Sequence, residues 1–268
     1  MNENHLIHCP GNPGYNPIFS VGEHEMKLTT FGLLKLDAGE SYSGDTAEFE
    51  CALVLLGGKC SVAGKDFDFA EVGKRKNVFD GAPHTVYLPR RTAYTVTALA
   101  GGVEIAVNLS PASRDTAKPT VITPEMPRTI SIGRDNFTRQ ATIMIDENFD
   151  SEHFYIGEGM IPSGNWSGYP PHRHDFDDLP GEIDMEETYF YRFDPECGFG
   201  IQKVYTTDGR IDQTYTVKYN DTVAIKEGYH PLCGAPGYQM YYLWTMAGSQ
   251  GRGLVSSMDP AHEWVRNG

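Results

Sequence analysis

Short runs of β-branched and aromatic residues, each closed by glycine, proline, asparagine or aspartate, recur along almost the whole chain. Each run is four to nine residues long, as strands are, and no long amphipathic pattern with helix caps interrupts them. Evenly spaced short strands of this kind build barrels or jelly-roll sandwiches. The sequence therefore predicts an all-β protein. The clearest runs are residues 51–57, 85–89, 93–100, 102–109, 141–145, 188–193, 213–217, 221–225 and 238–246.

A proline-rich stretch divides the chain into two parts of similar length. Residues 111–136 carry four prolines, and proline cannot donate to the ladder of a central strand. We therefore expect this stretch to be a crossover between two domains, residues 1–125 and 126–268. Both parts run through strands toward a late turn that contains proline or glycine. This weak internal repeat indicates a duplicated barrel rather than one continuous sandwich.

Charge and cysteine content limit the possible partners. A formal net charge of −14 argues against nucleic acid, whose binders need a basic stripe, and against anionic lipid. An anionic substrate must instead be attracted by a local cluster of cations. No apolar run approaches the roughly 18 residues of a membrane span, and the first residues do not read as a signal peptide. Five scattered cysteines without a C-x-x-C pair predict free thiols in a reduced, cytoplasmic protein.

A pair of histidines before a strand is the first sign of chemistry. His172 and His174 are separated by one residue. On a strand this spacing puts both imidazoles on one face, about 7 Å apart along the backbone. Their ring nitrogens can then converge on one metal ion at about 2.1 Å. The pair is therefore a candidate for metal binding.

An acidic residue and a third histidine follow the pair. Glu187 begins an aromatic strand, and period-2 alternation places it on one face with Tyr189, Tyr191 and Phe193. A carboxylate among buried aromatic residues is costly unless it is paired or coordinated. His230 follows an apolar strand and a glycine-containing turn, and the bond to Pro231 favours an extended conformation for it.

These residues resemble the two-part signature of the cupins, in which three histidines and one glutamate hold a divalent metal inside a small barrel. The resemblance implies a bicupin, with two β-barrel or jelly-roll domains, and gives His172, His174 and His230 as histidine ligands. The glutamate is less direct, because twelve residues separate His174 from Glu187 and the usual spacing falls on Asp178 or Leu179. We prefer Glu187 to Asp178, because residues 175–184 have the composition of a loop.

The first half follows the cupin pattern without its ligands. Residues 89–94 match the spacing of the second motif, but arginine replaces glycine and Tyr94 replaces histidine. Residues 47–62 look like the strand of the first motif, and no H-x-H pair precedes them. We therefore expect this barrel to have lost its metal and to serve structure or assembly, so that the protein is a homo-oligomer. His84, in a turn, is expected to be a solvated loop residue.

Beyond the general cupin pattern, the second half resembles the 5-deoxy-glucuronate isomerases of bacterial inositol catabolism. The resemblance covers nearly all of residues 134–265, and it explains the insertion between His174 and the glutamate. The 4-deoxy-hexulose-uronate isomerases of pectin breakdown share the metal motif. The matching blocks are residues 164–175, 186–193, 198–206, 227–231, 235–248 and 259–265.

The family resemblance implies an enzyme that converts 5-deoxy-D-glucuronate to 5-dehydro-2-deoxy-D-gluconate, an aldose–ketose isomerisation. A divalent ion (Zn, Mn, Fe, Co or Ni) would act as a Lewis acid on the sugar oxygens, and a neighbouring base would move a proton between adjacent carbons. Tyr242, Gln202 and Lys203 lie in the matching blocks and are candidates for the catalytic residue. Candidates for substrate binding are Arg139, Arg192 and Lys203 for the carboxylate and Trp244 for an aromatic wall; alternation counts against Arg192, which falls on the face opposite Glu187.

Two other functions fit the same residues. Three histidines and one glutamate around iron, with an open position, would make a cupin dioxygenase. A non-enzymatic bicupin that binds sugar acids is the other alternative, although storage forms usually lack the complete ligand set.

Overall fold

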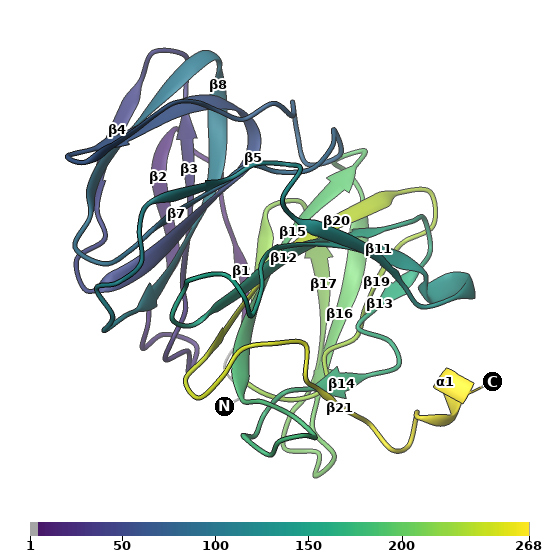
Figure 1. Cartoon of the computed structure of the whole chain (residues 1–268). Helices are drawn as coiled ribbons and strands as arrows, with labels where there is room; N and C mark the ends of the chain where they lie inside the picture. The colour runs from purple at the N-terminus through teal and green to yellow at the C-terminus, as the bar shows by residue number, and fades with distance from the viewer. Residues whose placement is uncertain (1–4, 268) are drawn as a thin grey trace.

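The computed structural model describes residues 5–267 and shows two antiparallel β halves that lie side by side (Figure 1). Helical structure in this range is limited to the 3-10 turn η1 (Asp135–Phe137) and the short helix α1 (Trp264–Asn267). The prediction of an all-β chain is thus confirmed. Within the described range, neither helix is long and apolar enough to cross a membrane.

The first half is one strongly bent sheet of eight strands in the order β2-β3-β8-β5-β7-β9, with β4 added beside β8 and β6 beside β5. Its interior is apolar because the inward positions of the long central strands are leucine, valine, isoleucine and alanine. The strands are β2 (Gly14–Phe19), β3 (Thr30–Leu36), β4 (Ser41–Asp45), β5 (Phe49–Gly64), β6 (Phe67–Val72), β7 (Thr85–Leu88), β8 (Ala93–Pro111) and β9 (Thr120–Ile122).

Two glycines let the central ribbon of this half fold over. Strands β5 and β8 pair along almost their whole length, with register shifts at Leu55/Gly57 and Gly58/Cys60. Gly58 and Gly102 both have positive φ, and a Cβ on Gly58 would lie 2.2 Å from the Gly102 carbonyl oxygen. Only glycine allows this close approach. The residues predicted as two strands, 93–100 and 102–109, are therefore one continuous bent strand.

The second half contains a seven-stranded sheet in the order β1-β18-β15-β20-β12-β11-β10, a four-stranded sheet β13-β19-β16-β17 and the pair β14-β21. The strands of the large sheet are β1 (Leu6–His8), β10 (Arg128–Ile132), β11 (Arg139–Ile145), β12 (Phe154–Ile161), β15 (Met185–Asp194), β18 (Asp221–Ile225) and β20 (Gln239–Gly248). The others are β13 (Trp166–Ser167), β14 (His172–Arg173), β16 (Phe199–Tyr205), β17 (Asp212–Lys218), β19 (Leu232–Gly234) and β21 (Ser257–Met258).

The chain passes between the halves in the proline-rich stretch, which also contributes the short strands β9 and β10. The predicted boundary between residues 125 and 126 falls between these two strands. The N-terminal strand β1 crosses the boundary, because Leu6 to His8 pair with Val223 to Asp221 of β18 in the second half. The two halves are thus joined by backbone pairing as well as by the linker.

A shared apolar core lies between the halves. It contains Phe31 and Val54 from the first half and Phe190 and Leu243 from the second, all of them buried. The rings of Phe31 and Phe190 have centroids 5.5 Å apart. Because this interface is packed like the interior of one domain, the two sheets hold each other in place.

Two buried glutamates fasten the interface at related positions. Glu186, the second residue of β15, accepts hydrogen bonds from the backbone N–H groups of Lys27, Leu28 and Thr29 at 2.8, 2.5 and 2.6 Å. Glu50, the second residue of β5, accepts the backbone N–H groups of residues 152 and 153, each at 2.8 Å. Each carboxylate thus binds a chain segment of the opposite half, as a duplicated fold would require.

The residues next to these glutamates differ between the halves. Glu187 follows Glu186, whereas Cys51 follows Glu50, and the buried Cys51 thiol contacts Tyr94. Tyr94 stands where the second cupin motif has its histidine, and its ring packs near Tyr42, with centroids 6.4 Å apart. Cys51, Tyr94 and Tyr42 therefore pack together in the first half, and the absence of a metal site there stays a prediction.

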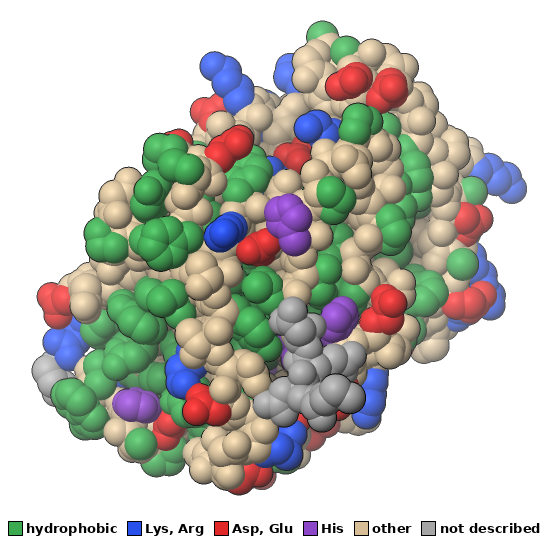
Figure 2. Space-filling view, turned by 180° about the vertical axis from the view of Figure 1, so that it is seen from behind, with side chains coloured by type: hydrophobic (Ala, Val, Ile, Leu, Met, Phe, Trp, Pro, Cys, Tyr) green, Lys and Arg blue, Asp and Glu red, His purple; other side chains and the backbone are tan. Residues whose placement is uncertain are grey.

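Charged side chains of both signs are mixed on one face of the molecule. Among the described residues on the face in Figure 2, lysine and arginine side chains lie scattered between acidic and hydrophobic ones. The exclusion of nucleic acid as a partner stays a prediction from the net charge.

Candidate metal centre

Glu187 is held by an interior strand of the large sheet. It is the third residue of β15, which pairs with β18 on one side and β20 on the other, so that Glu187 faces Ile225 and Met246. The neighbouring Glu186 faces the other way and binds the first half. Period-2 alternation thus sends one carboxylate into the second half and the other into the interface.

The histidines come from segments at the end of this sheet. His172 lies in the short strand β14, and His174 follows two residues later. His230 lies in the connection between β18 and β19, just after Gly228, whose φ of +99° allows the tight turn. The backbone N–H of Gly228 donates to the Asp175 carboxylate at 2.8 Å, which joins the two histidine-bearing segments.

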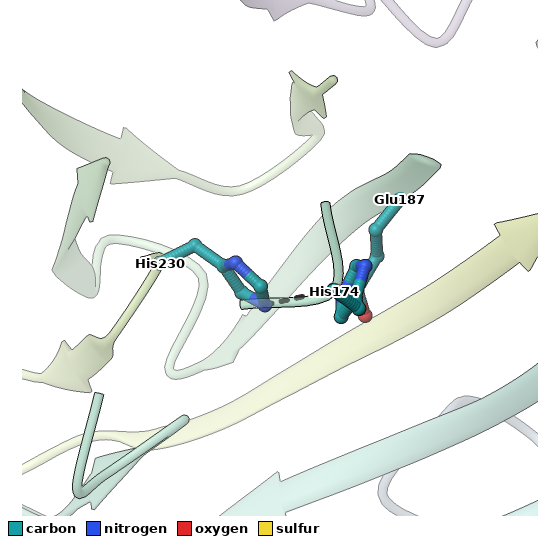
Figure 3. A group of neighbouring side chains, drawn as sticks. All are labelled: His174, Glu187 and His230. Atoms are coloured by element: carbon teal, nitrogen blue, oxygen red, sulfur yellow. Dashed lines mark hydrogen bonds and ion pairs between the residues drawn. The ribbon is translucent and has the colours of Figure 1, made fainter. Parts of the chain in front are cut away.

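Three of these side chains converge on one point (Figure 3). The Nε2 atoms of His174 and His230 lie 3.1 and 3.0 Å from Oε2 of Glu187, and all three side chains are buried. The His172 ring stands beside them, with its centroid 5.0 Å from that of His230 and 6.4 Å from that of His174. The structure thus brings three of the four predicted ligands together and places the ring of the fourth, His172, beside them. Asp178, the alternative, lies on an exposed loop and is bridged to Glu182.

Hydrogen bonds at Nδ1 fix the tautomer and the ring orientation of two of the histidines. Nδ1 of His174 faces the Met185 carbonyl oxygen, and Nδ1 of His230 faces that of Gly228 at 2.7 Å. A carbonyl only accepts, so both Nδ1 atoms carry hydrogen and both Nε2 lone pairs point toward Glu187. Nε2 of His230 is buried and has no hydrogen-bond partner among the residues that the structure describes. Lone pairs and a carboxylate oxygen converging in this way fit a cation, and nitrogen and oxygen donors suit a divalent transition metal.

The charge states of the cluster also suit metal binding. Burial alone would raise the pKa of Glu187, but His174 and His230, whose Nε2 atoms lie within 3.1 Å of its carboxylate, outweigh it and lower the pKa to about 2. Burial, together with His230 and His174, lowers the pKa of His172 to about 3. The carboxylate of Glu187 and the neutral imidazole of His172 are ligand forms that metals require. Burial alone would lower the pKa of His174, but the neighbouring Glu187 carboxylate outweighs it and raises that pKa.

Two glycines make room for large rings beside the centre. Gly157 and Gly159 of β12 face Trp244 and Tyr242 of β20 in the register. A Cβ on Gly157 would lie 2.0 Å from the Trp244 ring, and one on Gly159 would lie 2.2 Å from the Tyr242 ring. Both rings therefore lie flat across the glycine strand.

Tyr242 has a polar partner that the sequence did not suggest. Its hydroxyl lies 2.6 Å from Oγ of Ser167, and both groups are buried. The Tyr189 ring links Tyr242 to the centre, with centroid distances of 5.1 Å to Tyr242 and 5.9 Å to His230. Burial raises the pKa of the Tyr242 hydroxyl, while Arg139 opposes the shift. Ser167 lies within the block 164–175, but a lone serine there carries no signal of its own.

The other two catalytic candidates are differently placed. Gln202 is fully buried, and its amide nitrogen donates to the backbone carbonyl of His230 at 2.7 Å, so it orients that loop. Lys203 points outward and pairs with Asp212 at 2.5 Å on the surface. The position of Lys203 does not support a role in the centre.

The predicted substrate-binding residues also separate. Arg192 pairs with Glu104 at 2.8 Å and with the Tyr219 hydroxyl, in the groove between the halves, so its position does not support a role in the site. Trp244 stacks on Tyr155 in the core, with centroids 5.8 Å apart. Arg139 lines a cavity of about 570 Å³ that also reaches His172.

Comparison with known proteins identifies relatives over nearly the whole chain. The model of the KduI/IolB family matches residues 8–265 of the chain. A 5-deoxy-glucuronate isomerase of Geobacillus kaustophilus is 38% identical over 247 residues, which cover 92% of this chain and 87% of the relative. One of Listeria innocua is 35% identical over 265 residues, covering 95% and 90%.

Solved structures agree. An IolB-like protein of Salmonella typhimurium superimposes with a TM-score of 0.94 at 30% identity, covering 98% of this chain and all of that one. An oxalate decarboxylase variant of Bacillus subtilis gives a TM-score of 0.65 at 12% identity, covering 96% and 80%, and shows the fold alone. The predicted bicupin fold and the predicted family resemblance are both confirmed. The chain belongs to the KduI/IolB family.

Proposed function

We propose that the chain is a metal-dependent isomerase that converts 5-deoxy-D-glucuronate to 5-dehydro-2-deoxy-D-gluconate in inositol catabolism. The observation that carries the chemistry is the convergence of His174, His230 and Glu187 on one point beside His172. The substrate is supported by relatives named 5-deoxy-glucuronate isomerase, which are 33–38% identical over nearly the whole chain.

His172, His174, His230 and Glu187 would hold a divalent ion (Zn, Mn, Fe, Co or Ni) in this proposal. Such an ion acts as a Lewis acid on the carbonyl and neighbouring hydroxyl oxygens of the sugar. Gln202 keeps the His230 loop in place through its hydrogen bond to the backbone carbonyl of His230. Arg139 is the candidate partner of the substrate carboxylate, because it lines the cavity that reaches His172.

Tyr242 is the catalytic candidate that the geometry supports best. Its hydroxyl can exchange a proton, and it lies inside the second half one aromatic ring away from His230. Because burial raises its pKa, the hydroxyl is protonated at neutral pH and serves as a proton donor to a substrate oxygen. Ser167 orients the hydroxyl through their 2.6 Å hydrogen bond.

The proposed setting is the cytoplasm, since the five cysteines are all free thiols. Assembly into a homo-oligomer remains a prediction from the first half, which we expect to serve structure or assembly.

The experiment is to measure metal content and turnover of 5-deoxy-D-glucuronate for the wild type, Glu187→Gln and Asp178→Asn. We expect the wild type to bind about one metal ion per chain and to isomerise the sugar acid. Glu187→Gln should lose both properties, and Asp178→Asn, on the exposed loop, should keep them. If the metal-loaded wild type left this sugar acid unchanged but isomerised a 4-deoxy-hexulose-uronate, the proposed substrate would be wrong. Equal metal loss in both variants would contradict the assignment of Glu187.

A further inference from the structure

Arg139 differs from the other deeply buried arginines in its surroundings. It is 8% exposed, and only Nη1 donates hydrogen bonds, to the carbonyl oxygens of Phe137 at 3.2 Å and Tyr169 at 3.4 Å. No carboxylate of the described residues lies within ion-pair distance of it. A buried guanidinium without a counter-ion is costly, so this position is a place where an anion would be stabilised.

Two other buried arginines, unlike Arg139, are paired with carboxylates. Arg75 lies 3.0 Å from the Glu158 carboxylate, and Arg192 lies 2.8 Å from Glu104. In both pairs the carboxylate helps to raise the arginine pKa against the effect of burial, whereas burial lowers the pKa of Arg139. The fold therefore supplies a carboxylate to these two buried arginines and leaves Arg139 without one.

The cavity beside Arg139 has a charge pattern opposite to that of the whole chain. Its described lining includes Arg134, Arg139, Arg266 and His172, and no aspartate or glutamate. The chain as a whole has 36 acidic residues against 22 lysines and arginines. The three other cavities found among the described residues all include at least one acidic side chain in their lining. Of these four cavities, this is therefore the one whose described lining carries cations and no acidic side chain.

The arginines stand at different depths. Arg139 is buried, whereas Arg134 and Arg266 are exposed at the outer part of the cavity. Arg134 donates to the Val265 carbonyl at 2.8 Å, so it also holds the C-terminal segment that carries Arg266. Asp135, 3.6 Å from Arg134 and largely exposed, offsets part of that charge. The remaining wall is mostly apolar, which strengthens an ion pair formed inside it.

We propose that Arg139, with Arg134 and Arg266 outside it, forms an anion subsite that takes the carboxylate of an open-chain sugar acid. This proposal rests on the proposed function and deepens it. The subsite fixes the direction of binding, because a carboxylate at the arginines leaves the carbonyl end to enter toward His172 and the metal ligands. It also selects sugar acids over neutral sugars of the same length, since a neutral end group would leave Arg139 unpaired.

The test uses D-gluconate, an open-chain sugar acid without an aldehyde, and D-glucitol, its neutral counterpart. Binding of each to the metal-loaded full-length protein is measured by calorimetry. We expect gluconate to bind and glucitol to bind at least about tenfold more weakly, since each hydrogen bond to a charged group contributes enough for that factor. Equal binding of the two probes would overturn the proposal.

Variants identify the residues. Arg139→Gln should weaken gluconate binding by at least about tenfold. Arg139→Lys, which keeps the charge but loses the planar fork, should fall between Arg139→Gln and the wild type. Arg134→Gln and Arg266→Gln, both at exposed positions where folding is not at risk, should each weaken it several-fold. Arg128→Gln, exposed on β10 and outside the cavity lining, is the matched control and should bind as the wild type does. Wild-type binding in Arg139→Gln, or in both outer variants, would contradict the subsite.

Turnover separates this proposal from the proposed function. If the wild type isomerises 5-deoxy-D-glucuronate while Arg139→Gln keeps the wild-type KM, the subsite is wrong and the function stands. If the wild type shows no turnover but binds gluconate through Arg139, the subsite stands and the proposed function is wrong.

Discussion

At the scale of single residues, the bond between Ser167 and Tyr242 offers the most direct test of the catalytic assignment. We expect Ser167→Ala to lower kcat by about tenfold with little change in KM, because the Tyr242 hydroxyl loses the partner that orients it. Ser167→Thr, which keeps the hydroxyl, should recover part of the loss. Steady-state kinetics on both variants gives the answer.

A matched control separates orientation from general damage. Ser110 is a buried serine of the first half whose hydroxyl has no hydrogen-bond partner among the described residues, so Ser110→Ala removes a buried hydroxyl without breaking such a bond. It should leave kcat unchanged. A Ser167→Ala enzyme with wild-type kcat would show that Ser167 does not assist Tyr242.

Residue type and spacing predicted the candidate metal ligands better than the other site residues. An H-x-H pair and a glutamate that begins an aromatic strand have few other uses, and His174, His230 and Glu187 lie together with the His172 ring beside them. The candidates on β16 were harder to place, because in this strand hydrophobic side chains face solvent and a polar one faces inward. Phe199 and Ile201 are 43% and 38% exposed, while Gln202 is fully buried. Hydrophobicity alone therefore could not show that Lys203 faces outward. The expectation that His84 is solvated was also wrong, since it is 7% exposed and burial lowers its pKa.

At the scale of elements, the glycine positions of β12 decide where the Tyr242 ring can lie. We expect Gly159→Ala to fold but to lose most of its activity, because the added Cβ would lie 2.2 Å from that ring and push it away. Gly32→Ala is the matched control: its Cβ would lie 2.5 Å from the Tyr15 hydroxyl and 2.7 Å from the Tyr15 ring in the first half. Both variants should lose stability in urea unfolding, and only Gly159→Ala should lose kcat. Equal kcat in the two variants would contradict a role for the ring position.

Most strands could be predicted because each combines β-forming residues with turn residues at its ends. The connections and long-range pairings between the strands could not be predicted. The break expected at Gly101 is a bend within β8, since glycine serves a turn and a close approach equally well. The pairing of β1 with β18 joins residues more than 200 positions apart. Local sequence carries no record of such a partner.

At the scale of the whole molecule, the related glutamates Glu50 and Glu186 connect the two halves, and only one of them adjoins the metal centre. Duplication explains their similar roles, and divergence explains why Glu187 follows one and Cys51 the other. A partner in the opposite half cannot be read from local sequence, so neither glutamate could be assigned this role in advance. Their pairing does allow the structural and chemical parts of the second half to be separated by experiment.

Replacing either glutamate by alanine leaves backbone donors of the opposite half unpaired. Each variant should therefore lose at least about 3 kcal/mol of the free energy of unfolding in urea. Glu186→Ala should also weaken metal binding, because β15 loses the contacts that fix the position of the neighbouring Glu187. Glu50→Ala should keep wild-type metal affinity. Metal titration of both folded proteins measures this difference. If both variants lost metal affinity equally, the first half would support the centre as a whole, and the anchoring of β15 by Glu186 would not be a separate effect.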